Sequence, residues 1–413
     1  MKLLMVLPAS SPEGHQALYA LAVAQAARDR SWQVDLATPL AQMDYAAAMD
    51  LIRVVESTGG RLVDIPSVSP RWAGFLGYVE GQWRRWTAVR EAGKRAGSAG
   101  QYDVAYVDNG DGWYLPCCVM GIPIEAWPTV TIMLRLRYHH SSLTFGAAYQ
   151  VRNGSLQRVA FERFLRCPRL RAVLTPDRPL AEHHFHDHGV CGRKVQYIPD
   201  LGQSVSLVDR AEARKVLGIR EEKRVIVCLG LAERKGVQEL IAGLADRACP
   251  EVVSAMLMGS VDSKLAAWLR SDMPAGLITG GRLSIQNGVY GRQALATALS
   301  AADAVWLGYR NHIGSSSILW EAAQAGLPIL GRHTGLIAWE IRANDIGETV
   351  NIDDPAAVAR GLTRVLCDRE AGARWSRNGR QYGALHTPSA FGESVVNALE
   401  HASAPACTLV TAG

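Results

Sequence analysis

The sequence lacks the cysteine and charge patterns of several common protein classes. Its eight cysteines are spread over 413 residues with no C-x-x-C pair, so neither a zinc ribbon nor a disulfide framework is predicted. Lys and Arg outnumber Asp and Glu by only 44 to 39, and this small excess gives no support to nucleic-acid binding. We therefore expect a cytoplasmic protein that has no stable nucleic-acid partner.

Long apolar runs are missing as well. The most apolar long window, residues 117–134, is interrupted by Pro123, Glu125 and Pro128, which argues against a membrane span. The apolar run at Met1–Pro8 is too short for the core of a secretory signal. Its length and composition predict a first β-strand instead.

What the sequence does contain is a long alternation of strand-like and helix-like segments. Hydrophobic residues make up 48% and charged residues 20%, which is typical of folded proteins. The expected strands cover residues 2–8, 33–38, 61–65, 103–108, 129–134, 171–175 and 194–199, then 224–229, 253–258, 277–279, 304–307, 328–330 and 348–351. Because helix-length segments separate these strands, we predict an α/β fold with two parallel sheets, in two Rossmann-like doubly wound domains. The expected domains are residues 1–204 and 205–387, divided near the turn at Pro199–Gly202.

A basic loop follows the first strand of the second series. Gly230–Gly236 stands between strand 224–229 and a helix expected from about Val237. Backbone N–H groups at a helix N-terminus, with Arg234 and Lys235 beside them, suit a diphosphate. The alternative is a solvated helical turn, although cations at the positive end of a helix dipole are unfavourable without an anion.

A second loop of this kind follows strand 304–307. The run Gly314–Ser317 opens a helix with small residues and hydroxyls, which allows an anion to approach the backbone amides. Glu321 lies one turn into that helix, where its carboxylate could accept hydrogen bonds from the two vicinal hydroxyls of a ribose. The alternative is an ordinary glutamate on a helix surface.

Taken together, these pieces resemble a known family. Residues 224–362 resemble the nucleotide-sugar-binding domain of GT-B-fold glycosyltransferases, of the family-4-like group that mostly transfers sugars with retention. The matching pieces are, in order, Arg234-Lys235-Gly236-Val237, Ala302-Asp303-Ala304-Val305, Gly314-Ser315-Ser316-Ser317, the run from Glu321 to Ile329, and Gly335 with Gly347. The resemblance implies a transferase of GT-B fold whose last helix, residues 388–405, returns to the N-terminal domain. It also implies that the N-terminal domain binds the acceptor.

The resemblance further implies roles for single residues. Lys235 and Arg234 would bind the donor's diphosphate and stabilise the departing nucleotide, while Glu321 would hold the ribose. Beside Arg234, Lys235 and Glu321, the implied donor-binding residues are Gly14, Arg282, His312, Gly314, Ser315, Ser316 and Ser317. His15 joins Lys235 and Arg234 as a catalytic candidate, with a surface position at a helix start as the alternative.

Two positions depart from the family pattern. Ile313 stands where the family often has a glutamate that contacts the donor sugar, and His312 or Asn311 could supply replacement contacts. Leu231 stands after Gly230 where the family has an arginine, and Arg234 could take over that charge. The departure at Ile313 keeps two alternatives to a transferase: a nucleotide-sugar-binding protein without turnover, and an epimerase or hydrolase of nucleotide sugars.

Acceptor-side candidates come from the first domain. Asp108, Asn109 and Asp111 follow the strand at 103–108, so they lie on the edge where parallel sheets bind ligands. A simple Asx-rich turn is the alternative. His139 and His140 in the loop after the next strand complete this group, beside the aromatic stretch Trp72–Tyr78.

The resulting hypothesis is a glycosyltransferase that uses a nucleoside diphosphate sugar, with UDP as the expected nucleotide and no cofactor. Metal independence is expected because no Asp-x-Asp motif is present. The histidines at 183–188 have metal-ligand spacing, but we expect a solvated helix there. The basic, aromatic segment Gln82–Trp86 is also expected to be a solvated helix face, with contact to an anionic membrane as the alternative.

Overall fold

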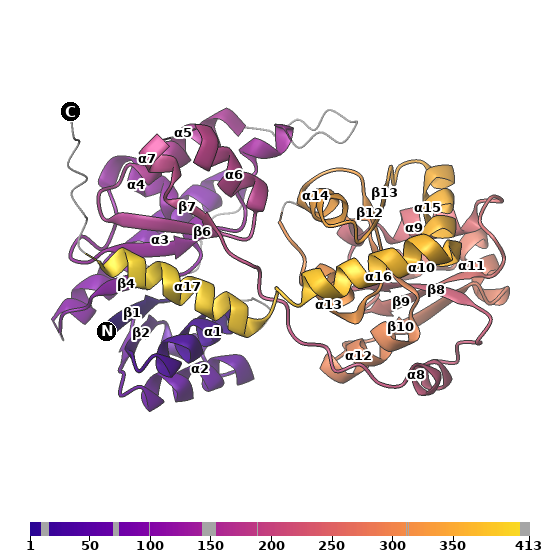
Figure 1. The fold of residues 1–413 in the computed structure, drawn as a ribbon, viewed down its shortest axis with the longest axis horizontal. Helices are drawn as coiled ribbons and strands as arrows, with labels where there is room; N and C mark the ends of the chain where they lie inside the picture. Colours follow the sequence, from indigo (N-terminus) through magenta and orange to yellow (C-terminus); the bar gives the residue numbers. More distant parts are fainter. Residues whose placement is uncertain are drawn as a thin grey trace. The chain divides into compact units, whose positions relative to one another are not determined.

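The computed structural model describes residues 1–9, 16–68, 74–98, 100–142, 154–187, 189–310, 312 and 314–404 (Figure 1). Contacts divide the chain into two compact units. Unit 1 consists of Met1–His139, Val151–Leu201 and Pro388–Gly413, and unit 2 consists of His140–Gln150 and Gly202–Thr387. Among the described residues, no helix has both the length and the apolarity needed to cross a membrane.

Unit 1 is built on a seven-stranded parallel sheet of order β3-β2-β1-β4-β5-β6-β7. Its strands are β1 (Lys2–Val6), β2 (Gln33–Thr38), β3 (Leu62–Asp64), β4 (Val104–Val107), β5 (Thr129–Ile132), β6 (Leu170–Thr175) and β7 (Val195–Tyr197). Successive residues of β1 enter different cores: Leu3 and Met5 pack on one face, and Leu4 and Val6 on the other. The near-continuous apolar sequence of β1 follows from this, since helices cover both faces of the sheet.

The helices of unit 1 are α1 (Gln16–Asp29), α2 (Ala46–Ser57), α3 (Gly74–Gly97), α4 (Tyr114–Met120), α5 (Gly154–Leu165), α6 (Arg178–Asp187), α7 (Gly189–Gly192) and α17 (Pro388–Ser403). Two 3-10 helices add to them, η1 (Leu40–Gln42) and η2 (Gly110–Gly112), and a third, η3 (Tyr138–Ser142), begins in unit 1 and continues into the segment His140–Gln150 of unit 2. The last helix, α17, packs along α1, and its buried residues Phe391, Val395 and Leu399 share a core with β1. A Cβ on Gly392 would lie 2.4 Å from the carbonyl oxygen of Ala22, so the absence of a side chain there allows the close contact.

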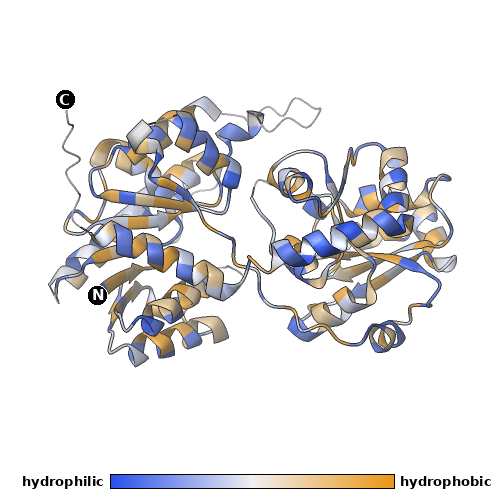
Figure 2. Cartoon of the chain, viewed as in Figure 1, coloured by the Kyte–Doolittle hydropathy of each residue, from blue (hydrophilic) through white to orange (hydrophobic). Residues whose placement is uncertain are grey.

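Unit 2 repeats the plan with a six-stranded parallel sheet of order β10-β9-β8-β11-β12-β13. Its strands are β8 (Arg224–Leu229), β9 (Val253–Gly259), β10 (Leu283–Asn287), β11 (Ala304–Leu307), β12 (Ile329–Arg332) and β13 (Gly347–Val350). Its helices are α8 (Arg210–Val216), the 3-10 helix η4 (Glu233–Lys235), α9 (Val237–Ala245), α10 (Ser263–Leu269), α11 (Asp272–Thr279), α12 (Arg292–Ala301), α13 (Ser317–Ala325), α14 (Leu336–Ala343), α15 (Pro355–Cys367) and α16 (Arg369–Gly383). Figure 2 shows how the mainly hydrophilic α16 contrasts with the apolar strands of this unit.

One predicted strand is wrong. Residues 277–279 end helix α11, and the sheet receives β10 at Leu283–Asn287 instead. The apolar triplet Leu277-Ile278-Thr279 belongs to a helix that begins after Ser271, and Gly280 and Gly281 end it. A short apolar run of this length does not distinguish a helix from a strand.

The strand order of each sheet reverses at one point. The first strand of unit 1, β1, lies between β2 and β4, and the first strand of unit 2, β8, lies between β9 and β11. Such switch points open a crevice at the carboxyl ends of the strands, which is where open parallel sheets bind ligands. In unit 2 the two predicted anion-binding loops follow the neighbouring strands β8 and β11.

Candidate functional site

The two loops meet at the switch point of unit 2. Gly236 has φ 66°, and a Cβ on it would lie 2.1 Å from the carbonyl oxygen of Gly308. Only glycine allows both this left-handed conformation and this approach at low cost. The contact brings the end of η4 against the segment that leads to α13.

Lys235 points into the protein. Its side chain is buried, its Nζ donates a hydrogen bond of 2.6 Å to the hydroxyl of Tyr309, and it lies 3.9 Å from the centre of that ring. Its own carbonyl accepts a 2.9 Å hydrogen bond from the indole of Trp306. The alternative of a solvated turn is therefore wrong for Lys235, although it describes the exposed Arg234.

Burial changes the protonation of Lys235. Removal from water, together with the neighbouring charge of Arg234, lowers the pKa of Lys235 to about 8. The phenol of Tyr309 accepts from this amine and lies 3.4 Å from the hydroxyl of Ser316. A bound anion would favour the charged form of Lys235, since it would replace the lost hydration.

Tyr309 was not predicted as a site residue. It follows β11 by two residues, and burial raises its pKa above the ordinary range. The one available signal was its place directly after a strand of the second series. His312 packs edge-on against it, with ring centres 5.2 Å apart, and hydrogen bonds to the carbonyl of Ser315.

Ser316 occupies the N-cap position of α13 with an extended backbone, and Ser317 is the first residue of that helix. Free backbone N–H groups in the first turn of a helix, together with its dipole, attract anions. The structure thus brings Lys235, Tyr309 and Ser316 together around one helix start. Gly314 and Ser315 lie in the loop that leads to it.

Glu321 is not the surface glutamate of the alternative hypothesis. Only 3% of it is exposed, on the buried side of α13. Its Oε1 accepts a 2.5 Å hydrogen bond from Nη1 of Arg292. Its buried Oε2 has no hydrogen-bond partner among the residues that the structure describes. Burial raises the pKa of Glu321 and the Arg292 guanidinium opposes that rise.

Arg282 does not join this group. It precedes β10, at the amino edge of the sheet, whereas the loops of the site lie at the carboxyl edge. Its guanidinium donates to the carbonyls of Cys249, Pro250 and Val253 and pairs with Glu251. We therefore correct its assignment: Arg282 joins the segment before β9 to β10 and is not a donor-binding residue.

A small recess lies beside the site. It is lined by Leu231, Glu233, Val237, Lys264 and Arg310, with Gln238, Glu239, Asp262 and Leu265 around them. Neither Lys235 nor Glu321 lines it. The recess flanks η4, so it borders the predicted diphosphate loop without containing its buried cation.

Three of the acceptor-side candidates, Asp108, Asn109 and Asp111, lie at the carboxyl edge of the sheet in unit 1. Asp108 directly follows β4 and is buried, and this burial raises its pKa to about 7. Asn109 has a left-handed backbone with φ 53°. Asp111 accepts hydrogen bonds from the backbone N–H groups of Leu134 and Arg135, which ties the loop after β4 to the loop after β5. The turn hypothesis thus fits Asp111, while Asp108 has the burial of a candidate for proton transfer.

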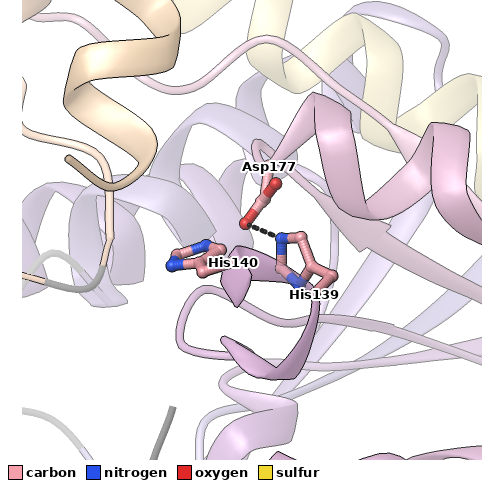
Figure 3. Close-up of side chains that lie close together, drawn as sticks. All are labelled: His139, His140 and Asp177. Carbon is pink, nitrogen blue, oxygen red and sulfur yellow. Dashed lines mark hydrogen bonds and ion pairs between the residues drawn. The ribbon is translucent and has the colours of Figure 1, made fainter. Parts of the chain in front are cut away.

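His139 forms a buried pair with Asp177, a residue that the sequence analysis did not single out. The ring Nε2 of His139 lies 2.8 Å from Oδ2 of Asp177, whose Oδ1 accepts from the backbone N–H of Leu180 at the start of α6. His140 is the next residue of the same 3-10 helix, and Figure 3 shows the three side chains close together. One ligand atom from each lies within 4.8 Å of the others, so the group has the chemistry and approximate spacing of a metal site.

The segment at 183–188 is not a fully solvated helix. His184 is buried, hydrogen bonds to the hydroxyl of Tyr138 and packs edge-on against Phe161. Its neighbour His186 is exposed as expected, and His188 lies outside the described residues. The solvated-helix prediction is therefore wrong for His184, whose aromatic neighbours are distant in sequence.

Helix α3 corrects a second prediction of the same kind. Trp83 and Arg90 are exposed, but Trp86 is buried and donates to the carbonyl of Gly121, and Gln82 is buried with a hydrogen bond to the carbonyl of Asp111. The predicted residues Gly14, His15, Asn311 and Ile313, and Trp72 of the aromatic stretch, lie outside the described residues.

Solved structures of glycosyltransferases share this architecture. HepE of Anabaena in complex with UDP is 17% identical, with a TM-score of 0.65 over 97% of this chain and 100% of that one. Sucrose-phosphate synthase of Thermosynechococcus elongatus is 17% identical, with a TM-score of 0.64 over 97% and 98%. WaaG, a glycosyltransferase involved in lipopolysaccharide biosynthesis, is 16% identical, with a TM-score of 0.61 over 96% and 99%. The two doubly wound units therefore have the GT-B fold.

The sequence of unit 2 matches a known family. Residues 209–382 match the glycosyl transferases group 1. This stretch includes Lys235, Ser316 and Glu321, the residues that the structure brings to the switch point. No curated protein gives a significant match to the sequence.

Proposed function

We propose that this protein is a glycosyltransferase that moves a sugar from a nucleoside diphosphate donor to an acceptor, with a UDP-sugar as the expected donor. The observation that carries the proposal is Glu321, whose buried Oε2 has no partner among the described residues and which lies on the helix whose N-cap position Ser316 occupies. A buried acceptor oxygen of this kind is costly until a donor such as a ribose hydroxyl reaches it. The family match over residues 209–382 and the UDP complex of HepE support the same assignment.

The donor groups would act on different parts of the nucleotide. Lys235 would exchange the Tyr309 hydroxyl for a phosphate oxygen, and the exposed Arg234 would approach the same diphosphate. The backbone N–H groups at the start of α13 would bind the phosphates, while Glu321 would accept from the ribose. Each of these contacts favours a diphosphate whose negative charge grows as it departs.

The reaction breaks the bond between the anomeric carbon and the phosphate oxygen and forms a bond to an acceptor oxygen, which loses its proton. Lys235 and Arg234 would stabilise the leaving nucleoside diphosphate. Asp108, with a pKa near 7, is our candidate in unit 1 for the acceptor's proton. We also propose retention at the anomeric carbon, as the family-4-like resemblance implies, and the anomer of the product tests this.

Two experiments test the proposal. Calorimetry measures the binding of UDP, ADP and GDP, and a second assay measures UDP release from UDP-sugars with and without acceptor mixtures. Release that depends on an acceptor supports a transferase, and mass spectrometry then identifies the glycosylated acceptor. Tight UDP binding with no turnover in any acceptor mixture would favour a binding protein. Consumption of the UDP-sugar without acceptor would favour a hydrolase or epimerase, the alternative that Ile313 keeps in view.

A further inference from the structure

Arg292 stands at an electrostatically unfavourable position, and hydrogen bonds to two acceptors offset this cost. It is the first residue of α12, after the N-cap Gly291, and a cation at a helix N-terminus is repelled by the helix dipole. Its Nη1 donates to Oε1 of Glu321 over 2.5 Å, and its Nη2 donates to the carbonyl of Ser204 over 2.8 Å. The guanidinium therefore connects α12 to α13 and to the segment that enters unit 2.

Because of this contact, the two carboxylate oxygens of Glu321 have different surroundings. Oε1 is taken by Arg292, while the buried Oε2 has no partner in the part of the chain that the structure describes. A carboxylate whose rotation is fixed at one oxygen presents the other in one direction. A protonated carboxyl group would instead present an O–H, which donates to a hydroxyl oxygen and accepts poorly.

We propose that Arg292 is a positioning residue that fixes the carboxylate of Glu321 and aims Oε2 at the ribose hydroxyls, so that the site selects ribonucleotides over 2′-deoxyribonucleotides. The identity of the ligand rests on the proposed function, but the role of Arg292 goes beyond it. Arg292 does not contact the nucleotide itself; it acts through Glu321.

Other charged and titratable groups near Glu321 could also change UDP affinity with pH. Arg292 faces it from α12, and Tyr309, which is hydrogen bonded to Lys235, interacts with it from the segment after β11. Because Lys235 and Tyr309 are unchanged in variants of Arg292, and the phosphates of the nucleotide titrate equally in all experiments, the ratio of wild-type to variant affinity isolates Glu321.

The test measures binding of UDP and 2′-deoxy-UDP to the full chain by calorimetry between pH 5 and pH 8. The variants are Arg292→Met, Arg292→Lys, Glu321→Gln and the double variant, with Arg270→Met as a control that removes an exposed cation of unit 2. We expect Arg292→Met to weaken UDP binding about tenfold and to reduce the preference for UDP over 2′-deoxy-UDP. In the Glu321→Gln background the same substitution should have no further effect, because Arg292 acts through that carboxylate.

The pH profile supplies a readout that a merely structural role would not move. Removing the guanidinium raises the pKa of Glu321, so Arg292→Met should lose UDP affinity at a higher pH than wild type as the solution is acidified. Arg292→Lys should retain part of the affinity and most of the wild-type profile, since it keeps the charge.

The outcomes separate the two claims. If the wild-type protein binds UDP and the Arg292→Met variant has the same affinity, selectivity and pH profile, the role of Arg292 is overturned. The proposed function is then unaffected. Additive losses in the double variant overturn it as well. Wild-type protein that binds no nucleotide overturns the proposed function and this inference with it.

Discussion

The ammonium group of Lys235 lies 2.6 Å from the hydroxyl of Tyr309 and 3.9 Å from the centre of its ring, so the main cation of the predicted diphosphate site is held against a phenol. The two residues belong to different loops, after β8 and after β11. Their contact exists because Gly236 lets those loops approach. It gives the nucleotide-free protein a neutral partner for a buried amine.

Replacing Lys235 should cost far more in turnover than in folding. Lys235→Ala removes a preorganised cation from the departing diphosphate, a loss that typically raises the barrier by about 2.7–4 kcal/mol. Initial rates of UDP release in the presence of acceptor measure the effect, and melting curves measure the fold. Lys264→Ala, which removes an exposed lysine near the same loop, is the control and should transfer normally. A Lys235→Ala enzyme with near-wild-type rates would remove this residue from the site.

UDP affinity should fall as pH rises through about 8. The pKa of Lys235 in the free protein is lowered to about 8, so above that pH the amine is mostly neutral and must take up a proton when the diphosphate binds. Calorimetry in two buffers of different ionisation enthalpy detects that proton. Lys235→Met should abolish both the proton uptake and the pH dependence near 8, and proton uptake that persists in this variant would assign it to another group.

Glu321→Gln should weaken UDP binding, and Glu321→Ala should weaken it more. The lost hydrogen bonds involve a charged acceptor and are worth about 1.5–3 kcal/mol. Glu233→Gln, a substitution at an exposed carboxylate of η4, serves as control. Equal UDP affinity in all three variants and wild type would show that the carboxylate at 321 has no ribose to bind.

Transfer should survive exhaustive chelation. The sequence has no Asp-x-Asp motif, and Arg234, Lys235 and the start of α13 can together neutralise a diphosphate. Rates measured before and after EDTA treatment test this. Activity that disappears and returns with zinc, manganese or magnesium would contradict the prediction and direct attention to His139, His140 and Asp177. In that case His139→Ala should lose the metal response, while His186→Ala, at an exposed histidine of α6, should keep it.

Gly392→Ala should destabilise unit 1 by about 1–3 kcal/mol, because its Cβ would lie 2.4 Å from the backbone of α1. Gly372→Ala is the matched control: Gly372 lies in α16, where a Cβ meets nothing within 4 Å, and alanine there favours the helix. Denaturant melts of both variants, followed by near-UV signals of the two units, measure the effect. Equal stability of the two variants would contradict the close packing of α17 on α1.

The sequence predicted those site residues whose position depends only on the order of strands and of the segments that follow them. Lys235 and Ser316 could be proposed from the sequence because they lie in the segments that follow β8 and β11, and Glu321 because it lies one turn into the helix that follows the second segment. Parallel strands deliver such segments to one edge of the sheet. The side chains that bind these residues could not be predicted. Tyr309 and Arg292 reach the site through contacts between elements far apart in sequence, and no local pattern distinguishes them from other aromatic or basic residues.

The errors have the same origin. Arg282 is predicted to bind the donor, yet it precedes β10, and this puts it at the amino edge of the sheet, opposite the loops of the site. His184 lies on a short helix whose polar sequence suggests exposure, yet Tyr138 and Phe161 cover it. Burial by residues 20 or more positions away overrides what a helix face indicates by itself.

The packing of α17 on α1 also has a consequence for the order in which the chain can fold during synthesis. Almost all of unit 2 is one uninterrupted stretch, Gly202–Thr387, whereas the core of unit 1 includes residues from both sides of it. On the ribosome, the groove along α1 stays open until the whole of unit 2 has been translated and Phe391 emerges. Unit 2 can therefore complete its core first, and the N-terminal unit, although made earlier, is finished last. Of the apolar surfaces of the nascent chain, the surface of α1 that α17 later covers would therefore stay exposed longest, and a chaperone that protects nascent chains would bind there.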